Sequence, residues 1–165
     1  MLPKLYSVFS FGLIIMTASC GNIYQNPPKD PVRTAILRSE ATRSGVFTWT
    51  HVTVEAVNDK AINYLTAVTT ESKEIVVPAG NQNVVLAGTF NQAFGGAGPF
   101  EARGDLTINF KPGMDYKANG RVHGSKMLLW IEDTRTGKPA SKVLEVPYQS
   151  MPRYTSTPIF IPASN

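Results

Sequence analysis

Short stretches rich in β-branched and aromatic residues, separated by turn residues, fill most of this chain of 165 residues. The turn residues recur about every eight to twelve positions. No window of about a dozen residues keeps apolar side chains at helical spacing without a proline or glycine inside it. Such a succession of short strands is typical of two packed antiparallel sheets. We therefore expect an all-β fold, a single antiparallel β-sandwich.

The expected strands and turns are spread along the chain after its first 32 residues. The strands are residues 33–39, 46–57, 61–69, 75–77, 84–87, 106–110 and 126–134, with turns at 58–60, 78–81, 112–113 and 136–137. Within one of them, Leu106, Ile108 and Phe110 alternate with polar residues, which predicts a half-buried strand. The glycine-rich residues 91–104 are expected to form an exposed loop.

The stretch 46–57 has an unusual parity. Phe47 and Trp49 share one face of an extended strand, whereas Val52 and Val54 share the other. Two interpretations follow. Either both faces are half covered, or a bulge near residues 50–51 changes which face points inward.

The first 19 residues have the composition of a secretion signal. Lys4 supplies a positive charge, and residues 5–16 supply an apolar run shorter than the about 20 residues that span a bilayer. The small residues 17–19 then precede Cys20, the only cysteine of the chain, so no intramolecular disulfide can form. An ordinary cleaved signal with a free cysteine near the cut is the alternative.

Ala18, Ser19 and Cys20, followed by Gly21, resemble the lipobox of bacterial lipoproteins. The resemblance implies that Cys20 is acylated and becomes the mature N-terminus, with Thr17 standing where the family more often has leucine. A thiol can carry a thioether-linked lipid, and several acyl chains anchor a protein stably. In the family, aspartate after the cysteine favours the inner membrane. Gly21 therefore favours the outer membrane, with the domain facing the periplasm.

These features divide the chain into three segments. We expect a signal peptide at 1–19, an acylated N-terminus with an extended tether at 20–32, and a β-sandwich domain at 33–165 that ends in a proline-rich tail. Residues 21–31 hold three prolines and no alternating pattern. This composition predicts a spacer that keeps the domain off the lipid surface.

A second, looser resemblance covers residues 73–137. A proline-glycine turn precedes a strand, a Phe-x-Pro-Gly-x-x-Tyr stretch follows, and another strand ends in an Asp-x-x-Thr-Gly turn. The residues concerned are Pro78, Gly80, Phe110, Pro112, Gly113, Tyr116, Asp133, Thr136 and Gly137. The plan resembles that of small envelope lipoproteins with a transthyretin-like or PEGA-like sandwich, with Asn58-Asp59-Lys60 in place of their usual Asp-Gly-Lys hairpin. It implies an immunoglobulin-like or transthyretin-like fold and transfers no active site.

The charge pattern does not indicate a nucleic-acid partner. The formal net charge is +4, but the basic residues are scattered rather than gathered in a cluster or a basic helix. The partners that we expect are the membrane, through the lipid anchor, and a protein of the envelope.

The two histidines, His51 and His123, do not suggest a catalytic or metal site. A zinc site needs three or four ligands, and the two histidines stand alone in the sequence. We expect His51 to pack in mid-strand beside Trp49, and His123 to lie in a turn. The sequence has no Gly-x-Ser-x-Gly motif, and the closeness of Ser125 to His123 is a coincidence of spacing. A serine–histidine–acid triad could therefore form only from residues that are distant in the sequence and that the fold brings together. We therefore expect no catalytic residue, no metal and no cofactor.

Other motifs also have structural interpretations. The glycine-rich residues 94–98 lack the helix start that a phosphate site requires, and residues 136–138 lack the upstream glycine of a Walker motif. Glu132 and Asp133 are consecutive strand residues that point to opposite faces, so they indicate the end of a strand entering a turn.

Trp49 and Trp130 are expected to be core aromatics. The alternative is that they form an exposed platform for a sugar or a peptide, which would require the two rings to be coplanar.

The tail, residues 145–165, holds prolines that exclude a helix or a central strand. They are Pro147, Pro152, Pro158 and Pro162. We expect an edge strand that packs along the sandwich. The alternative is an extended segment that docks on a partner by strand addition, which would make Ile159, Phe160 and Ile161 partner-binding residues.

Together these patterns predict a non-catalytic envelope lipoprotein that binds a partner or has a structural role. One alternative is a periplasmic hydrolase or carbohydrate-binding accessory that uses Trp49, Trp130 or the loop at 91–104. Another is a secretion-machine lipoprotein resembling the sandwich lipoprotein of type VI secretion. An enzyme should join His51 or His123 to an acid and a nucleophile in one pocket, whereas a binding module should show an exposed apolar face or a free sheet edge.

Overall fold

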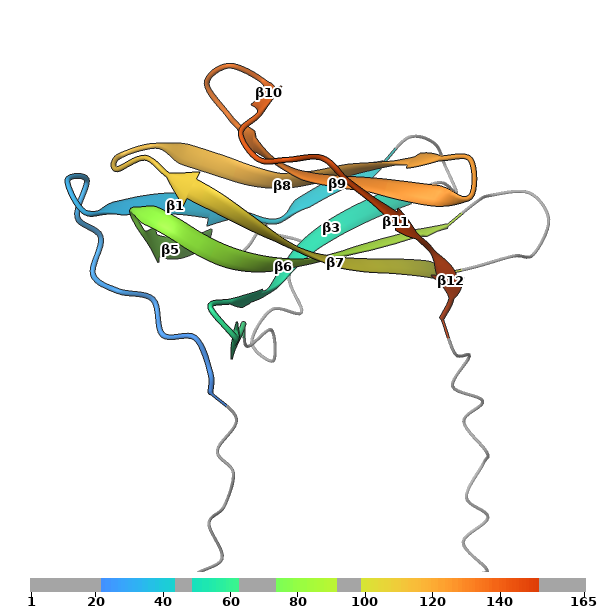
Figure 1. Ribbon diagram of the computed structural model, residues 1–165, viewed down its shortest axis with the longest axis horizontal. Coiled ribbons are helices and arrows are strands. Elements are labelled where there is room, and N and C mark those ends of the chain that lie inside the picture. The colour runs from blue at the N-terminus through green and yellow to red at the C-terminus, as the bar shows by residue number, and fades with distance from the viewer. Residues whose placement is uncertain (1–21, 44–48, 63–73, 92–98, 152–165) are drawn as a thin grey trace, which may run out of the picture.

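The computed structural model describes residues 22–43, 49–62, 74–91 and 99–151, and these form two packed β-sheets without a helix (Figure 1). The strands of the described residues are β1 (Thr34–Arg38), β2 (Glu40–Arg43), β3 (Trp49–Val57), β4 (Lys60–Ala61), β5 (Glu74–Pro78), β6 (Gly80–Asn91), β7 (Phe100–Phe110), β8 (Asp115–His123), β9 (Lys126–Asp133), β10 (Lys138–Pro139), β11 (Leu144–Pro147) and β12 (Gln149–Ser150). The predicted all-β sandwich is confirmed.

Each sheet is named here by its two central strands. The β8/β9 sheet has the order β10-β9-β8-β1-β5, and β11 also pairs with β9. The β6/β7 sheet has the order β12-β7-β6-β3-β2, and β4 also pairs with β3. Every pairing of named strands is antiparallel except that of β1 with β8, which is parallel.

The chain repeatedly crosses from one sheet to the other. The expected turn at 78–81 carries the chain from β5 to β6, where Gly80 has a φ of 100°, and the turn at 112–113 carries it from β7 to β8. A third crossing occurs at Ser39, a buried residue between β1 and β2, so the expected strand 33–39 ends there. At each of these crossings the chain connects the two sheets covalently.

The core lies between the sheets, and in β7 and β9 buried residues alternate with more exposed ones. In β7, Leu106, Ile108 and Phe110 are buried while the residues between them are exposed, as predicted. The largest fully buried side chains are Phe90, Phe110, Leu37, Ile75, Leu86, Met127, Leu129 and Ile131. Burying each such side chain stabilises the fold by about 1.5–3 kcal/mol.

The parity of β3 has an explanation that differs from the predicted one. A register shift does occur, but between Val54 and Ala56 rather than near residues 50–51. Because β3 pairs without interruption from Trp49 to Val54, Val52 and Val54 point inward and Trp49 points outward, with 37% of its surface exposed. The shift then returns Val57 to the core.

The predicted turn after β3 is confirmed as a tight hairpin into β4. Asn58 and Asp59 have φ values of 48° and 61°, the left-handed region that two-residue hairpin turns require. The Asn58 side chain is fixed in place, since its Oδ1 accepts the Asn83 amide at 2.9 Å. Asp59 is exposed and makes the turn at a conformational cost that glycine would avoid.

Asp59→Gly should therefore raise the free energy of unfolding by up to about 1 kcal/mol, and Asp59→Val should lower it by about 1–2 kcal/mol. Urea-induced unfolding of the two variants beside the wild type measures both changes. Equal stability of the glycine and valine variants would contradict the left-handed turn.

Candidate functional site

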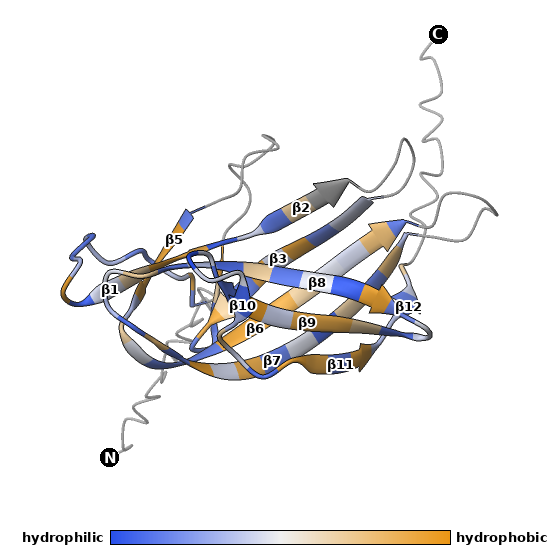
Figure 2. Cartoon of the chain, turned by 90° about the horizontal axis from the view of Figure 1, so that it is seen from above, coloured by the Kyte–Doolittle hydropathy of each residue, from blue (hydrophilic) through white to orange (hydrophobic). Residues whose placement is uncertain are grey.

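The two side margins of the sandwich differ in how their strand edges are covered. One margin is formed by β5 together with β2 and β4, and the other by β11 and β10 together with β7 and β12. Figure 2 shows the second margin with β7 and β11 side by side, across the molecule from β2 and β5. An uncovered edge presents backbone N–H and C=O groups that can pair with another chain.

At the first margin, the N-terminal segment, residues 22–31, covers β5 and β4. Val76 of β5 lies opposite Ile36, whose amide donates to Met114 instead, so both backbone groups of Val76 point away from β1. The Tyr24 hydroxyl donates to the Val76 carbonyl at 2.7 Å, and the Val76 amide donates to Asn26 Oδ1 at 3.2 Å. Two side chains of the segment thus take the place of a neighbouring strand.

The same segment is also held at its beginning and near its end. Ile23 forms a parallel bridge with Ala61 of β4, in which the Tyr24 amide donates to the Ala61 carbonyl at 2.8 Å. Lys29 forms an ion pair with Glu74 of β5 and, with Arg38, holds the pKa of Glu74 below its usual range. Burial raises the pKa of Tyr24 to about 12, so its hydroxyl stays protonated as a donor.

This arrangement corrects the predicted spacer. The segment is extended, as expected, but from Asn22 onward it is bonded to the domain rather than forming a free spacer. The composition of the segment showed no packing signal because its contacts are made by single polar atoms, not by an alternating apolar pattern.

The second margin is open along most of β7. Among the described residues, β12 pairs with only Phe100 and Glu101, and no strand continues this pairing toward Phe110. The Met151 amide donates to the Pro99 carbonyl at 2.9 Å, which fixes the odd-numbered residues of β7 as those whose backbone groups point outward. The N–H and C=O groups of Asp105, Thr107 and Asn109 therefore face this margin.

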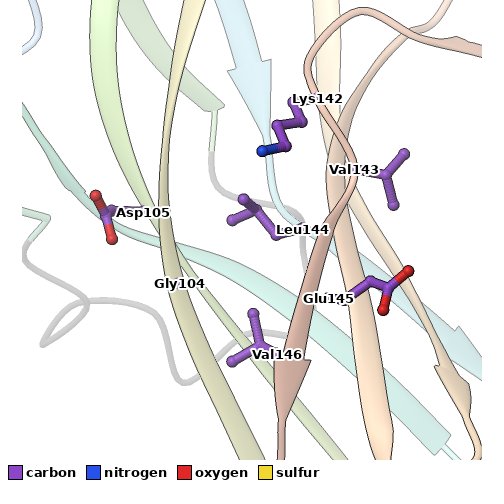
Figure 3. Close-up of a pocket in the computed structure, with 7 residues that line it drawn as sticks. All are labelled: Gly104, Asp105, Lys142, Val143, Leu144, Glu145 and Val146. Carbon is purple, nitrogen blue, oxygen red and sulfur yellow. The ribbon is translucent and has the colours of Figure 1, made fainter.

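A groove of about 490 Å³ lies where β11 meets this edge (Figure 3). Leu144 and Val146 point from β11 toward β7, whereas Val143 and Glu145 point the other way. Glu145 is paired with Lys126 at 3.0 Å. The Lys142 side chain extends toward the same side as Leu144, and Asp105 lines the groove from β7, so the groove has an apolar floor and a rim with charges of both signs.

Gly104 allows β11 to approach β7 at the floor of the groove. A Cβ atom there would lie 3.0 Å from both Leu144 Cδ1 and Val146 Cγ2, closer than ordinary packing allows. Gly104 belongs to β7, as do residues 100–103, so the expected exposed loop at 91–104 is wrong for this part. The glycine content of this stretch did not distinguish a loop from a strand, because glycine occurs where strands approach closely as well as in loops.

One end of the groove is closed by aromatic side chains. Tyr148, between β11 and β12, packs edge-on against Phe90 and Phe100, with ring centroids 4.9 and 5.2 Å away. The Tyr148 hydroxyl donates to the Gly124 carbonyl at 3.2 Å. The chain thus passes from one sheet to the other at this end and leaves the remainder of the margin open.

The two histidines lie on opposite outer faces of the sandwich. His51 is on the outer face of the β6/β7 sheet, in register with Thr89, and burial lowers its pKa. His123 is exposed and ends β8, immediately before the turn that contains Ser125. The fold therefore does not bring His51 and His123 to one substrate. The described part of the chain also contains no group of three or more potential metal ligands.

Glu132 and Asp133 have structural roles at the end of β9, as predicted. Burial alone would raise the pKa of Glu132, but the Asn119 amide, the Lys117 ammonium and the Trp130 indole outweigh it and lower this pKa. Asp133 accepts the Arg135 amide at 2.9 Å in the following turn.

The prediction that Trp49 is a core aromatic is wrong, because the uninterrupted register of β3 with β6 places Trp49 on the outer face. Trp130 is half-buried on the outer face of the β8/β9 sheet, so it too lies outside the core. Its Nε1 atom is buried and near enough to the Glu132 carboxylate to lower the pKa of that group, but the two do not meet in good hydrogen-bond geometry. The two indoles are on opposite faces and cannot form one platform.

Three predicted features lie outside the described residues. They are Cys20, the tail residues Ile159, Phe160 and Ile161, and the glycine-rich residues 94–98. The groove, in contrast, was missed by the sequence analysis. Its available signal was the alternation of Leu144 and Val146 with Glu145 ahead of Pro147, which marks a short edge strand.

Comparisons with known proteins give no relative. No protein-family model matches the chain, and neither a curated protein nor a solved structure is detectably similar to it. The part of the chain that the structure describes has no helix of a length and hydrophobicity that would cross a bilayer.

The buried environment of His51 predicts a pH dependence of stability. Because the pKa of His51 is lower in the folded state than its ordinary 6.5, the unfolded chain binds the proton more readily. The free energy of unfolding should therefore fall as the pH drops from about 7.5 through 6.5. The depressed pKa values of Glu74 and Glu132 act only below 4.5.

His51→Gln should flatten this dependence between about pH 7.5 and 5.5, as measured by urea unfolding at each pH. Thr89→Val, which alters the cross-strand neighbour of His51 without removing a titratable group, should keep the wild-type slope. A wild-type slope in the glutamine variant would contradict the assignment to His51.

Proposed function

We propose that this protein is a lipid-anchored binding module of the bacterial envelope, which takes up an extended segment of a partner protein along the open edge of β7. The observation that carries the proposal is the edge of β7 beyond Glu101, which no other described strand pairs with, beside the apolar floor of the groove. Extended peptides add to such edges through main-chain hydrogen bonds, and pockets for alternate side chains supply specificity.

The anchoring part of the proposal rests on Cys20. It follows a positively charged residue, an apolar run and three small residues, as in a lipobox. Gly21 favours the outer membrane and a domain that faces the periplasm. The multiple acyl chains of a mature lipoprotein would hold the domain stably on the membrane.

The binding part rests on how the margin presents its groups. The backbone groups of Asp105, Thr107 and Asn109 can pair with an added strand. Side chains on one face of that strand would reach Leu144 and Val146. The preferred partner is thus an extended segment with apolar residues at every second position.

The geometry favours this function over the hydrolase and carbohydrate alternatives. A hydrolase would need His51 or His123 beside an acid and a nucleophile, but the described neighbours of these two residues are strand partners on opposite faces. A sugar platform would need coplanar indoles, and Trp49 and Trp130 face opposite directions. The secretion-machine alternative would need a partner-binding loop beyond the sandwich. Its candidate is the glycine-rich stretch 91–104, of which residues 92–98 lie outside the described residues and 100–104 belong to β7.

The test uses Thr107→Pro, with Thr107→Ala as its matched control. Proline removes one outward N–H and adds a ring at the edge, yet it leaves the ladder with β6 intact because that amide does not face β6. A photo-crosslinking residue in place of Asn109 is introduced into each full-length chain in its native membranes. We expect one partner in the wild type and in Thr107→Ala, with about tenfold less of it in Thr107→Pro.

The bound segment of that partner, made as a synthetic peptide, should bind the purified protein and the alanine variant equally and the proline variant about tenfold more weakly. Equal crosslinking and equal peptide affinity in all three proteins would refute strand addition at β7. Absence of labelled palmitate on Cys20 would refute the anchoring part.

A further inference from the structure

We infer that the sandwich rests directly on the lipid surface, with the β3–β4 hairpin toward the bilayer, rather than being held away from it by a spacer. This inference rests on the proposed lipid attachment at Cys20. It concerns how the anchored domain is oriented, which the sequence pattern did not address.

The distance from the proposed lipid attachment at Cys20 to the folded domain is limited by a single intervening residue, Gly21. Only Gly21 stands between Cys20 and Asn22, and the Asn22 carbonyl accepts the Ala61 amide at 2.9 Å. Two residue steps of extended chain reach at most about 7 Å. An acylated Cys20 would therefore lie within about 7 Å of Asn22, which is itself bonded to β4.

The attachment of the segment is distributed along its length. After the bridge to Ala61, the segment is bonded to Val76 through Tyr24 and Asn26, and it is paired with Glu74 through Lys29. A free segment of ten residues would instead allow the domain to move about 30 Å from its anchor. Because the segment is bonded to β4 and β5, the domain cannot move away from Cys20 in this way.

The surface around this attachment has the chemistry of a membrane interface. Ile23 has 55% of its surface exposed, although it is a large apolar residue. Beside it, a groove of about 410 Å³ is lined by the apolar side chains of Ala56, Ala61, Ile62 and Val85 together with Thr53 and with Glu55, which is paired with Arg103. Lys60 is exposed at the hairpin, where its ammonium can reach lipid phosphates.

The orientation leaves the candidate binding site accessible. The anchor attaches at the margin of β4 and β5, whereas the open edge of β7 belongs to the opposite margin. The turn before β10 lies on the far side of the molecule from β4 in Figure 1. This turn should therefore project away from the bilayer.

The test measures the depth of two exposed positions in the full-length lipidated protein. Lys60→Cys and Arg135→Cys, the second in the turn before β10, are each labelled with a fluorophore. The proteins are reconstituted into phosphatidylethanolamine and phosphatidylglycerol vesicles that contain headgroup spin-labelled lipid. We expect the spin label to quench the fluorophore at position 60 at least threefold more than the one at position 135.

A variant with ten glycine and serine residues inserted between Gly21 and Asn22 keeps the segment bonded to β4 and β5 but lengthens the link to the lipid. It should lower the quenching at position 60 to that at position 135. Equal quenching at the two positions in the uninserted protein, or quenching unchanged by the insertion, would overturn the inference.

Labelled palmitate on the same samples separates the two proposals. An acylated protein with equal quenching refutes the orientation alone and leaves the proposed anchoring intact. A protein that is not acylated at Cys20 refutes both.

Discussion

The pairing of Val76 with the N-terminal segment is the interaction on which the arrangement of this protein depends. Both backbone groups of Val76 point outward from β5, and a buried backbone group without a partner costs about 1–3 kcal/mol. Tyr24 and Asn26 satisfy these groups and thereby cover the edge of β5. Next to them, Asn22 and Tyr24 are bonded through their backbones to Ala61, which fixes the start of the described chain against β4.

The opposite margin, at β7, is left mostly uncovered by the described chain. This difference suggests that the two margins have different roles. At β7, the described chain supplies a partner only for Phe100 and Glu101, and Tyr148 closes that end. Beyond it, charged and polar residues such as Asp105 occupy the edge, which discourages indiscriminate pairing. Leu144 and Val146 add an apolar surface beside it. One margin is thus occupied by the chain itself, and the other presents the features that an extended partner requires.

The sequence predicted what depends on local alternation and on turn chemistry. Leu106, Ile108 and Phe110 were assigned to the core because one face of β7 is buried without interruption, and Asn58–Asp59 formed the expected turn because both residues tolerate positive φ. The predictions that were wrong concern residues whose position depends on neighbouring strands that are distant in the sequence. The outward position of Trp49 follows from the continuous register with β6, and the strand position of Gly104 follows from the close approach of β11. The candidate groove was missed for the same reason, since its walls come from two sheets.

Amide hydrogen exchange tests most directly the claim that one margin is covered and the other open. The account predicts that the Val76 amide, bonded to Asn26, exchanges at least about tenfold more slowly than the outward amide of Thr107 in the isolated protein. Asn26→Ala should raise the exchange rate of Val76 and leave that of Thr107 unchanged. An amide of Thr107 that exchanges as slowly as that of Val76 would contradict the account, because it would show that the β7 edge is already paired.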